Sequence, residues 1–205
     1  MKYEVRDVAT GLWLWRVEHP AWRPELDWDP LVTSVCVESR GEIGVLDPID
    51  PSAEVWSRLD ARPPTFAVVL KPDHIRDVDL FVDRYRVRAF GPDLFFRDDV
   101  PQAELEPIAP GSKLPGGLLA LYDGRGRQET PLYLPEQRAL VFADGLTAPE
   151  GELRVWATPW HRERVLPALR DLLELPFELV IVSHGDPVHT RADYERALRR
   201  APWGG

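Results

Sequence analysis

Three short apolar runs, each followed by a polar loop, constrain the fold of this chain more than any other feature. The runs cover residues 65–70, 138–143 and 178–183. Short apolar runs bounded by turn residues are typical of strands buried on both faces of a sheet. Polar side chains that follow such strands are costly to bury without partners, and these loops are where α/β proteins build their sites. We therefore expect an α/β protein whose functional residues lie in these three loops.

Alternating and turn-bounded segments predict the remaining elements. Further strands are expected at residues 4–9, 12–18, 31–37, 42–47, 87–90, 118–122, 130–134 and 153–157. Helices are expected at 52–59, with Ser52 as N-cap, at 162–175 and at 191–199. A further helix is expected to follow the polar loop at 71–73 and to end at about Tyr85. Two groups of strands with helices outside them predict a βα–αβ sandwich, formed by one domain over residues 1–205. We expect residues 93–110 to cover the cleft.

Charge and cysteine content exclude several classes of protein. The 205 residues carry 25 Lys and Arg against 34 Asp and Glu, a net charge of −9, without a basic stripe to attract a phosphate backbone. The lone Cys36 excludes an intramolecular disulfide and Cys-rich metal modules. No apolar run approaches the roughly 18 residues of a membrane span, and the charged N-terminus lacks a signal-peptide core. We expect a cytoplasmic protein without nucleic-acid or membrane partners. The abundant Trp residues leave a homodimer possible, because exposed Trp would favour one.

The three loops after the apolar runs contain the candidate functional residues. These are Lys71, His74, Arg76 and Asp77 in the first loop, Asp144 in the second and His184 in the third. Taken singly, an Asp before Gly is usually a turn residue, and a lone histidine is usually structural. Their joint order and spacing are more specific.

In this order the segments resemble the metallo-β-lactamase superfamily. The similarity covers about residues 31–190 and is carried by residues 46–48, 68–77, 140–146 and 179–188. The segment YLPEQRALVFAD at residues 133–144 is similar to the one with the family's bridging aspartate, and VSHGDP at 182–187 to the one with its last histidine ligand. The resemblance implies a four-layer αββα sandwich with its site along one edge, which agrees with the order of strands and helices.

The first metal-binding motif of that family, T-H-x-H-x-D-H, is only partly present. When the motif is aligned on residues 68–70, Lys71 takes the place of its Thr and Pro72 that of its first His. His74 matches the second His, while Arg76 takes the place of the Asp and Asp77 that of the final His. Proline has no donor atom for a metal, and a guanidinium cannot ligate one. The loop expected to carry a further histidine, residues 111–116, has none. Of the family's usual ligands the resemblance leaves His74, Asp144 and His184, with Asp77 as a substitute.

These departures leave two hypotheses for the site. The sequence favours a non-catalytic or atypical hydrolase-like binding protein whose degraded site holds no tightly bound metal, because a divalent ion a few Å from a guanidinium is repelled by several kcal/mol. In that site Arg76, with Lys71 or Lys113, pairs with Asp144 and Asp77 as a counter-charge. The same three cations could then face a small anionic ligand.

The alternative is a divergent mononuclear hydrolase. One zinc or iron ion, held by His74, Asp144 and His184, would activate water for attack on an ester, thioester or lactone. Asp144 or Asp77 would orient that water as the catalytic carboxylate, and Arg76 would hold an anionic group of the substrate. The sequence identifies no particular substrate.

Overall fold

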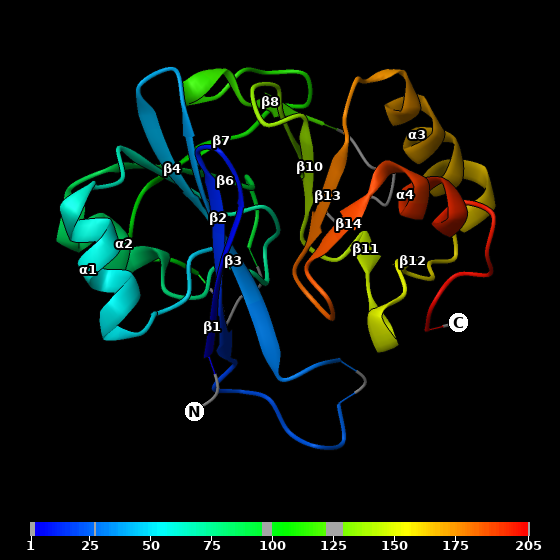
Figure 1. The fold of residues 1–205 in the computed structure, drawn as a ribbon, viewed down its shortest axis with the longest axis horizontal. Helices are drawn as coiled ribbons and strands as arrows, with labels where there is room; N and C mark the ends of the chain where they lie inside the picture. Colours follow the sequence, from blue (N-terminus) through cyan, green and yellow to red (C-terminus); the bar gives the residue numbers. More distant parts are fainter. Residues whose placement is uncertain (1–2, 27, 96–99, 122–128, 205) are drawn as a thin grey trace.

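The computed structural model describes residues 3–26, 28–95, 100–121 and 129–204 (Figure 1). One sheet has seven strands in sequence order: β1 (Tyr3–Ala9), β2 (Leu12–Glu18), β3 (Leu31–Ser39), β4 (Glu42–Leu46), β5 (Phe66–Val68), β6 (Arg88–Gly91) and β7 (Leu105–Pro107). The other has the order β14 (Val188–Thr190), β13 (Leu179–Val182), β10 (Ala139–Phe142), β9 (Leu132–Leu134) and β8 (Leu119–Ala120). A small third sheet pairs β11 (Leu146–Thr147) with β12 (Arg154–Val155).

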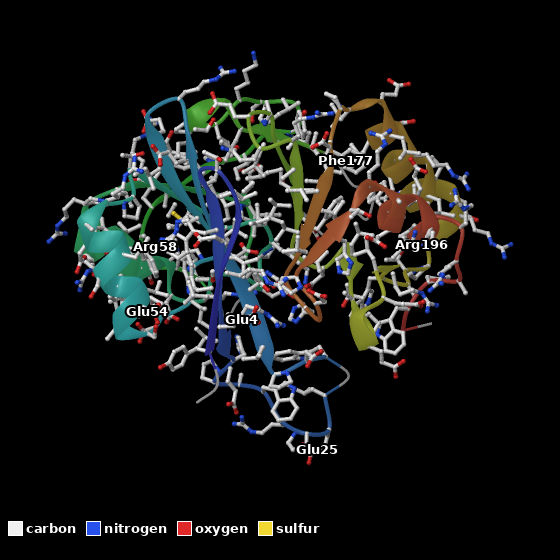
Figure 2. The ribbon with its side chains drawn as sticks, viewed as in Figure 1. Glu4, Glu25, Glu54, Arg58, Phe177 and Arg196 are labelled. Carbon is white, nitrogen blue, oxygen red and sulfur yellow. The ribbon has the colours of Figure 1, made fainter. Side chains whose placement is uncertain are left out.

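Helices cover the outer face of each large sheet. In Figure 1, α1 (Ala53–Ala61) and α2 (Val78–Tyr85) flank the seven-stranded sheet, and α3 (Leu166–Asp171) and α4 (Arg191–Ala197) flank the five-stranded sheet. The order of layers is therefore αββα, as the sequence predicts. Short helical turns complete the chain: η1 (Pro115–Gly117), η2 (Pro149–Gly151), the π-helical η3 (His161–Val165) and η4 (Leu172–Glu174). The labelled charged side chains of α1 and α4, Glu54, Arg58 and Arg196, lie at the two flanks (Figure 2).

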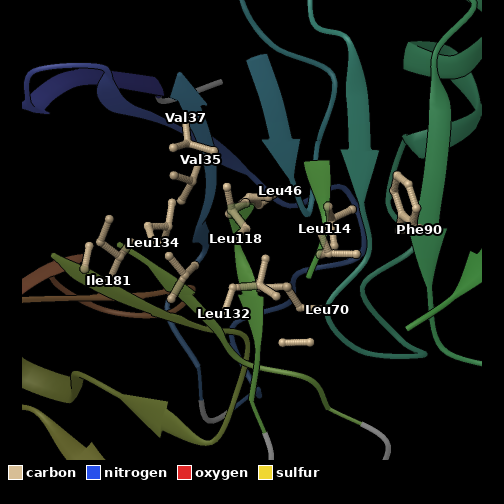
Figure 3. Close-up of a cluster of buried hydrophobic side chains, with 14 of the residues drawn as sticks. Val35, Val37, Leu46, Leu70, Phe90, Leu114, Leu118, Leu132, Leu134 and Ile181 are labelled. Atoms are coloured by element: carbon tan, nitrogen blue, oxygen red, sulfur yellow. The ribbon is translucent and has the colours of Figure 1, made fainter. Parts of the chain in front are cut away.

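Apolar side chains of the two inner faces hold the sheets together. Val35, Leu46 and Leu70 from the first half of the chain meet Leu132 and Ile181 from the second half, and all five are buried (Figure 3). Fully burying a side chain of this size contributes about 1.5–3 kcal/mol. A second cluster lies between the five-stranded sheet and its helices, and a third lies between the seven-stranded sheet and its helices.

Parallel pairing brings the ends of the site strands to one edge of the sandwich. β4 pairs with β5 in parallel, with Leu46 opposite Val68, and β10 pairs with β13 in parallel, with Phe142 opposite Val182. Each strand therefore ends level with its neighbour, and the loops that follow begin side by side. A bridge between Val32 and His184 joins the two large sheets at this edge.

Most of the predicted elements are present with shifted boundaries. Three predictions are confirmed: the first hairpin, the βαβ unit formed by β5, α2 and β6, and the Ser52 N-cap of α1. The Ser52 side chain accepts a hydrogen bond from the Val55 amide. Helix α2 begins only at Val78, because the residues before it form turns. The region predicted as one helix at 162–175 begins as a π turn and ends as a 3-10 turn.

Part of the predicted cleft cover is a strand instead. Leu105–Pro107 forms β7, which pairs in parallel with β6 at the margin of the large sheet. Residues 96–99 of that stretch, and residue 122 at the end of the strand predicted at 118–122, lie outside the described residues. No helix of the described chain is long and apolar enough to cross a lipid bilayer.

Candidate functional site

A cavity of about 280 Å³ opens where the loops after β5, β10 and β13 meet. It is lined by His19, Trp28, Val32, Lys71, Asp73, His74, Arg76, Asp144, Trp156 and His184. Five of the residues singled out from the sequence are therefore brought together here. The other two, Asp77 and Lys113, do not line this cavity.

Three potential ligand atoms converge in the cavity. Oδ1 of Asp144 lies 3.1 Å from Nε2 of His74 and 3.2 Å from Nε2 of His184. All three atoms lie within 4.8 Å of one another. Oδ1 is nevertheless buried without a well-directed hydrogen-bond partner among the described residues.

His74 is oriented from behind by Asp47, which follows strand β4. Its Nδ1 lies 2.8 Å from Oδ2 of Asp47, whose other carboxylate oxygen accepts the Leu70 amide at 2.7 Å. The His74 amide donates to the Lys71 carbonyl at 2.9 Å, which closes the turn after β5. These contacts aim Nε2 of the ring at the cavity.

The charges around Asp144 set the protonation of the cluster. Burial alone would raise the pKa of Asp144, but His74 and His184 hold that pKa well below its usual range. Burial alone would lower the pKa of His74, but the charges of Asp144 and Asp47 outweigh it and raise the pKa. Burial lowers the pKa of His184 against the opposing attraction of Asp144. Asp144 is therefore a carboxylate, and His184 is a neutral imidazole at neutral pH.

Lys71 occupies the second oxygen of Asp144. Its Nζ lies 2.5 Å from Oδ2 of Asp144 and also contacts the carboxylate of Asp73, while the lysine side chain is only 4% exposed. A lysine nitrogen on Asp144 is one of the contacts that the metal-free hypothesis requires.

Arg76 has different partners from those expected. Its guanidinium donates to the carbonyls of Thr33 at 2.6 Å and Asp47 at 2.8 Å, and to the hydroxyl of Ser183. No described residue forms an ion pair with it, so the expected pairs with Asp144 and Asp77 are absent from the described part of the chain. Arg76 instead ties β3, the end of β4 and the end of β13 together, and it presents a positive charge to the cavity.

Glu129 is a supporting residue that the sequence reasoning missed. Its buried carboxylate, 4% exposed, accepts hydrogen bonds from the amides of Ala143, Asp144 and Gly145 at 2.9–3.2 Å. The loop that carries Asp144 is thereby fixed. No local pattern marks Glu129, because its partners lie 14–16 residues further along the chain.

Aromatic side chains form another part of the wall. Trp28 packs edge-on against both His19 and His184, with ring centroids 5.4 and 5.2 Å apart. Burial and the positive charge of Arg76 lower the pKa of His19 to about 4, so its ring is neutral. Trp156 also lines the cavity. The sequence placed none of these three residues at the site.

Asp77 and Lys113 are held elsewhere. Oδ2 of Asp77 accepts the amide of Asp50 at 2.7 Å, where the residue stands at the start of α2. Lys113 is exposed and forms an isolated bridge with Leu119. Their predicted roles as catalytic carboxylate and anion-binding cation gain no support from these positions.

Solved structures provide the comparison, since no protein-family model and no curated protein matches the sequence. A metallo-β-lactamase from Pontibacter korlensis matches 98% of this chain and 100% of its own chain, with a TM-score of 0.69 and 15% identity. The FIM-1 metallo-β-lactamase of Pseudomonas aeruginosa, in its mono-zinc form, matches 97% of this chain and 94% of its own chain, with a TM-score of 0.70 and 16% identity. A metallo-β-lactamase from Hirschia baltica matches 97% of both chains, with a TM-score of 0.68 and 16% identity. The chain has the metallo-β-lactamase fold.

Proposed function

We propose that this protein is a hydrolase that uses a single divalent metal ion held by His74, Asp144 and His184. The observation that carries the proposal is the buried Oδ1 of Asp144, which lacks a well-directed hydrogen bond although two imidazole nitrogens lie 3.1 and 3.2 Å away. An unsatisfied buried carboxylate oxygen is costly, and a cation would satisfy it.

The donor set fits a zinc or iron ion. Two imidazoles and a carboxylate form a common catalytic set for zinc, and also for non-haem iron. Ligand atoms about 2.0–2.2 Å from a tetrahedral ion lie roughly 3.3–3.6 Å from one another. Oδ1 of Asp144 lies 3.1 and 3.2 Å from the two imidazole nitrogens, slightly closer than that. The contact of Asp47 with Nδ1 of His74 is also typical of metal sites, where a carboxylate behind the imidazole fixes the ring and raises its basicity.

The chemistry follows from what surrounds the three ligands. A divalent ion supplies Lewis-acid polarisation and an activated water when it is bound in such a site. Arg76 offers an anionic group of the substrate a charge that no described carboxylate neutralises by direct contact. Trp28 and Trp156 offer apolar surface. The cavity volume of about 280 Å³ restricts the substrate to a small molecule, and we propose a small anionic ester, thioester or lactone.

A metal-free anion-binding protein is the second candidate, and the contact between Lys71 and Asp144 favours it. With His74 protonated, as its raised pKa allows, the cations Lys71, His74 and Arg76 balance the carboxylates Asp47, Asp73 and Asp144. The cluster is then neutral without an added ion. A small carboxylate held by Arg76 would be the ligand of such a protein.

Metal analysis separates the two candidates. The metal content of the purified protein is measured, and chelator-treated protein is titrated with zinc and, anaerobically, with ferrous iron. We expect one ion per chain in the wild type and in the control Asp171→Asn, which alters an exposed carboxylate at the end of α3. Asp144→Asn should lose the ion and the hydrolysis of small esters, thioesters and lactones. A folded wild type that takes up neither metal, but binds small carboxylates in an Arg76-dependent way, would establish the second candidate instead.

A further inference from the structure

We propose that the ammonium of Lys71 is a built-in second cation of this site, which occupies one oxygen of Asp144 and limits the cavity to a single metal ion. This inference rests on the proposed metal site. It concerns how many ions the site takes and how tightly it binds them.

The two carboxylate oxygens of Asp144 face different partners. Oδ1 faces Nε2 of both His74 and His184, whereas Oδ2 accepts the Lys71 ammonium at 2.5 Å. A carboxylate can bridge two cations through its two oxygens. Here one of the two cationic positions is filled by a side chain of the protein itself.

Lys71 is held where it can act in this way. Its side chain is almost fully buried, and its ammonium contacts Asp73 as well as Asp144. Its backbone is also restricted, because Pro72 follows it and its carbonyl accepts the His74 amide. The turn that places His74 therefore places the ammonium too.

The charge of Lys71 has a predictable effect on metal binding. A fixed positive charge close to a metal ligand repels a divalent ion, strongly so where water is excluded. Lys71→Met keeps most of the length of the side chain and removes the charge, so zinc should bind at least about tenfold more tightly. A second ion can also bind once Asp73 and Oδ2 of Asp144 are released. If Lys71 only supported the structure, its removal would loosen Asp144 and weaken zinc binding.

The test is a calorimetric zinc titration of chelator-treated protein, with bound zinc counted by elemental analysis. The wild type, Lys71→Met, Lys71→Arg and Arg170→Met are compared, the last as a control that removes an exposed cation from α3. We expect Lys71→Met to bind zinc at least tenfold more tightly or to bind two ions, and Lys71→Arg and Arg170→Met to resemble the wild type. Melting temperatures with and without zinc identify folded variants, and Lys71→Gln replaces Lys71→Met if that variant does not fold.

The outcomes distinguish this inference from the proposed function. A folded, uncharged variant with wild-type or weaker zinc binding overturns the role of Lys71 while the single-metal site stands. If the wild type binds neither zinc nor ferrous iron but Lys71→Met binds zinc, the metal-dependent function is wrong and Lys71 is confirmed as the cation that takes the metal's place. If no variant binds zinc, the role of Lys71 is wrong, and if the wild type does not bind ferrous iron either, the metal-dependent function is wrong as well.

Discussion

Oδ2 of Asp47 lies 2.8 Å from Nδ1 of His74, and this contact determines which nitrogen of the ring faces the cavity. Asp47 is 5% exposed at its side chain, and its position depends on the parallel pairing of β4 with β5. The contact leads to the first prediction.

Asp47→Asn should weaken zinc binding 10- to 100-fold, because carboxylates behind a ligating histidine typically contribute that much to metal affinity. The asparagine keeps an oxygen for the Leu70 amide, so the fold should be retained. Competition with a coloured chelator measures the affinity, with Asp171→Asn as control. Equal affinities in the folded variant and the wild type would show that Asp47 supports the loop and not the metal.

Gly185 follows His184 and has a conformation and surroundings that exclude a side chain. Its φ is +82°, and an added Cβ would lie 2.0 Å from the Ala148 carbonyl oxygen. Gly151, with φ +80° and no atom within 4 Å of an added Cβ, is a matched control. Gly151→Ala should cost about 1–2 kcal/mol of unfolding free energy from the backbone conformation alone. Gly185→Ala should cost at least about 2 kcal/mol more, because backbone must move.

Urea denaturation of both alanine variants measures this difference. Similar losses of unfolding free energy would mean that the approach of Gly185 to Ala148 is not tight in solution.

Glu129→Gln should destabilise the protein by about 2 kcal/mol, because buried amides that donate to a charged acceptor lose part of their hydrogen bonding. Glu136→Gln alters an exposed carboxylate near the same sheet and should change stability by no more than about 0.5 kcal/mol. Chemical denaturation compares the two variants. A similarly small effect at both positions would contradict the anchoring role of Glu129.

The thiol of Cys36 should be unreactive in the native protein at pH 8. Burial raises its pKa to about 12, so it is not a thiolate at that pH. A disulfide reagent such as dithionitrobenzoate should label the urea-unfolded chain rapidly and the native chain only through unfolding. Fast labelling under native conditions would mean that strand β3 opens locally around Cys36.

The same shift predicts a pH dependence of stability. The unfolded thiol, with a pKa near 9.0, loses its proton at a pH where the folded thiol keeps it. The folded state then binds more protons, so unfolding free energy should fall as the pH rises from about 9 towards 12. Cys36→Ser should show a smaller decline relative to its own stability at pH 8, and the remaining decline comes from groups such as Tyr85, whose pKa burial raises to about 12.

The sequence by itself determined the layers and the main candidate ligands. Residues 65–70, 138–143 and 178–183 are apolar enough to mark buried strands, and polar residues that follow buried strands collect at one sheet edge. His74, Asp144 and His184 were therefore identifiable as candidate site residues before their distances were known, and the resemblance to the metallo-β-lactamase superfamily implied their role as ligands. The Ser52 cap and the first hairpin were also predictable, because their signals are local.

Only the tertiary structure decided which charges meet. From the sequence, Arg76 together with Lys71 or Lys113 was expected to pair with Asp144. Of these three cations only Lys71 contacts Asp144, and Arg76 donates to backbone carbonyls instead. Asp47 lies in segment 46–48, which carried part of the resemblance, but its contact with His74 had no signal in the sequence, and no pattern marked Glu129. Part of the predicted cleft cover is strand β7, at the margin of the large sheet. Hydrophobic periodicity is a local property of the sequence and can be recognised without a structure. The partner of a buried charge is not local, because it depends on which atoms the packing of the fold brings within a few Å of that charge.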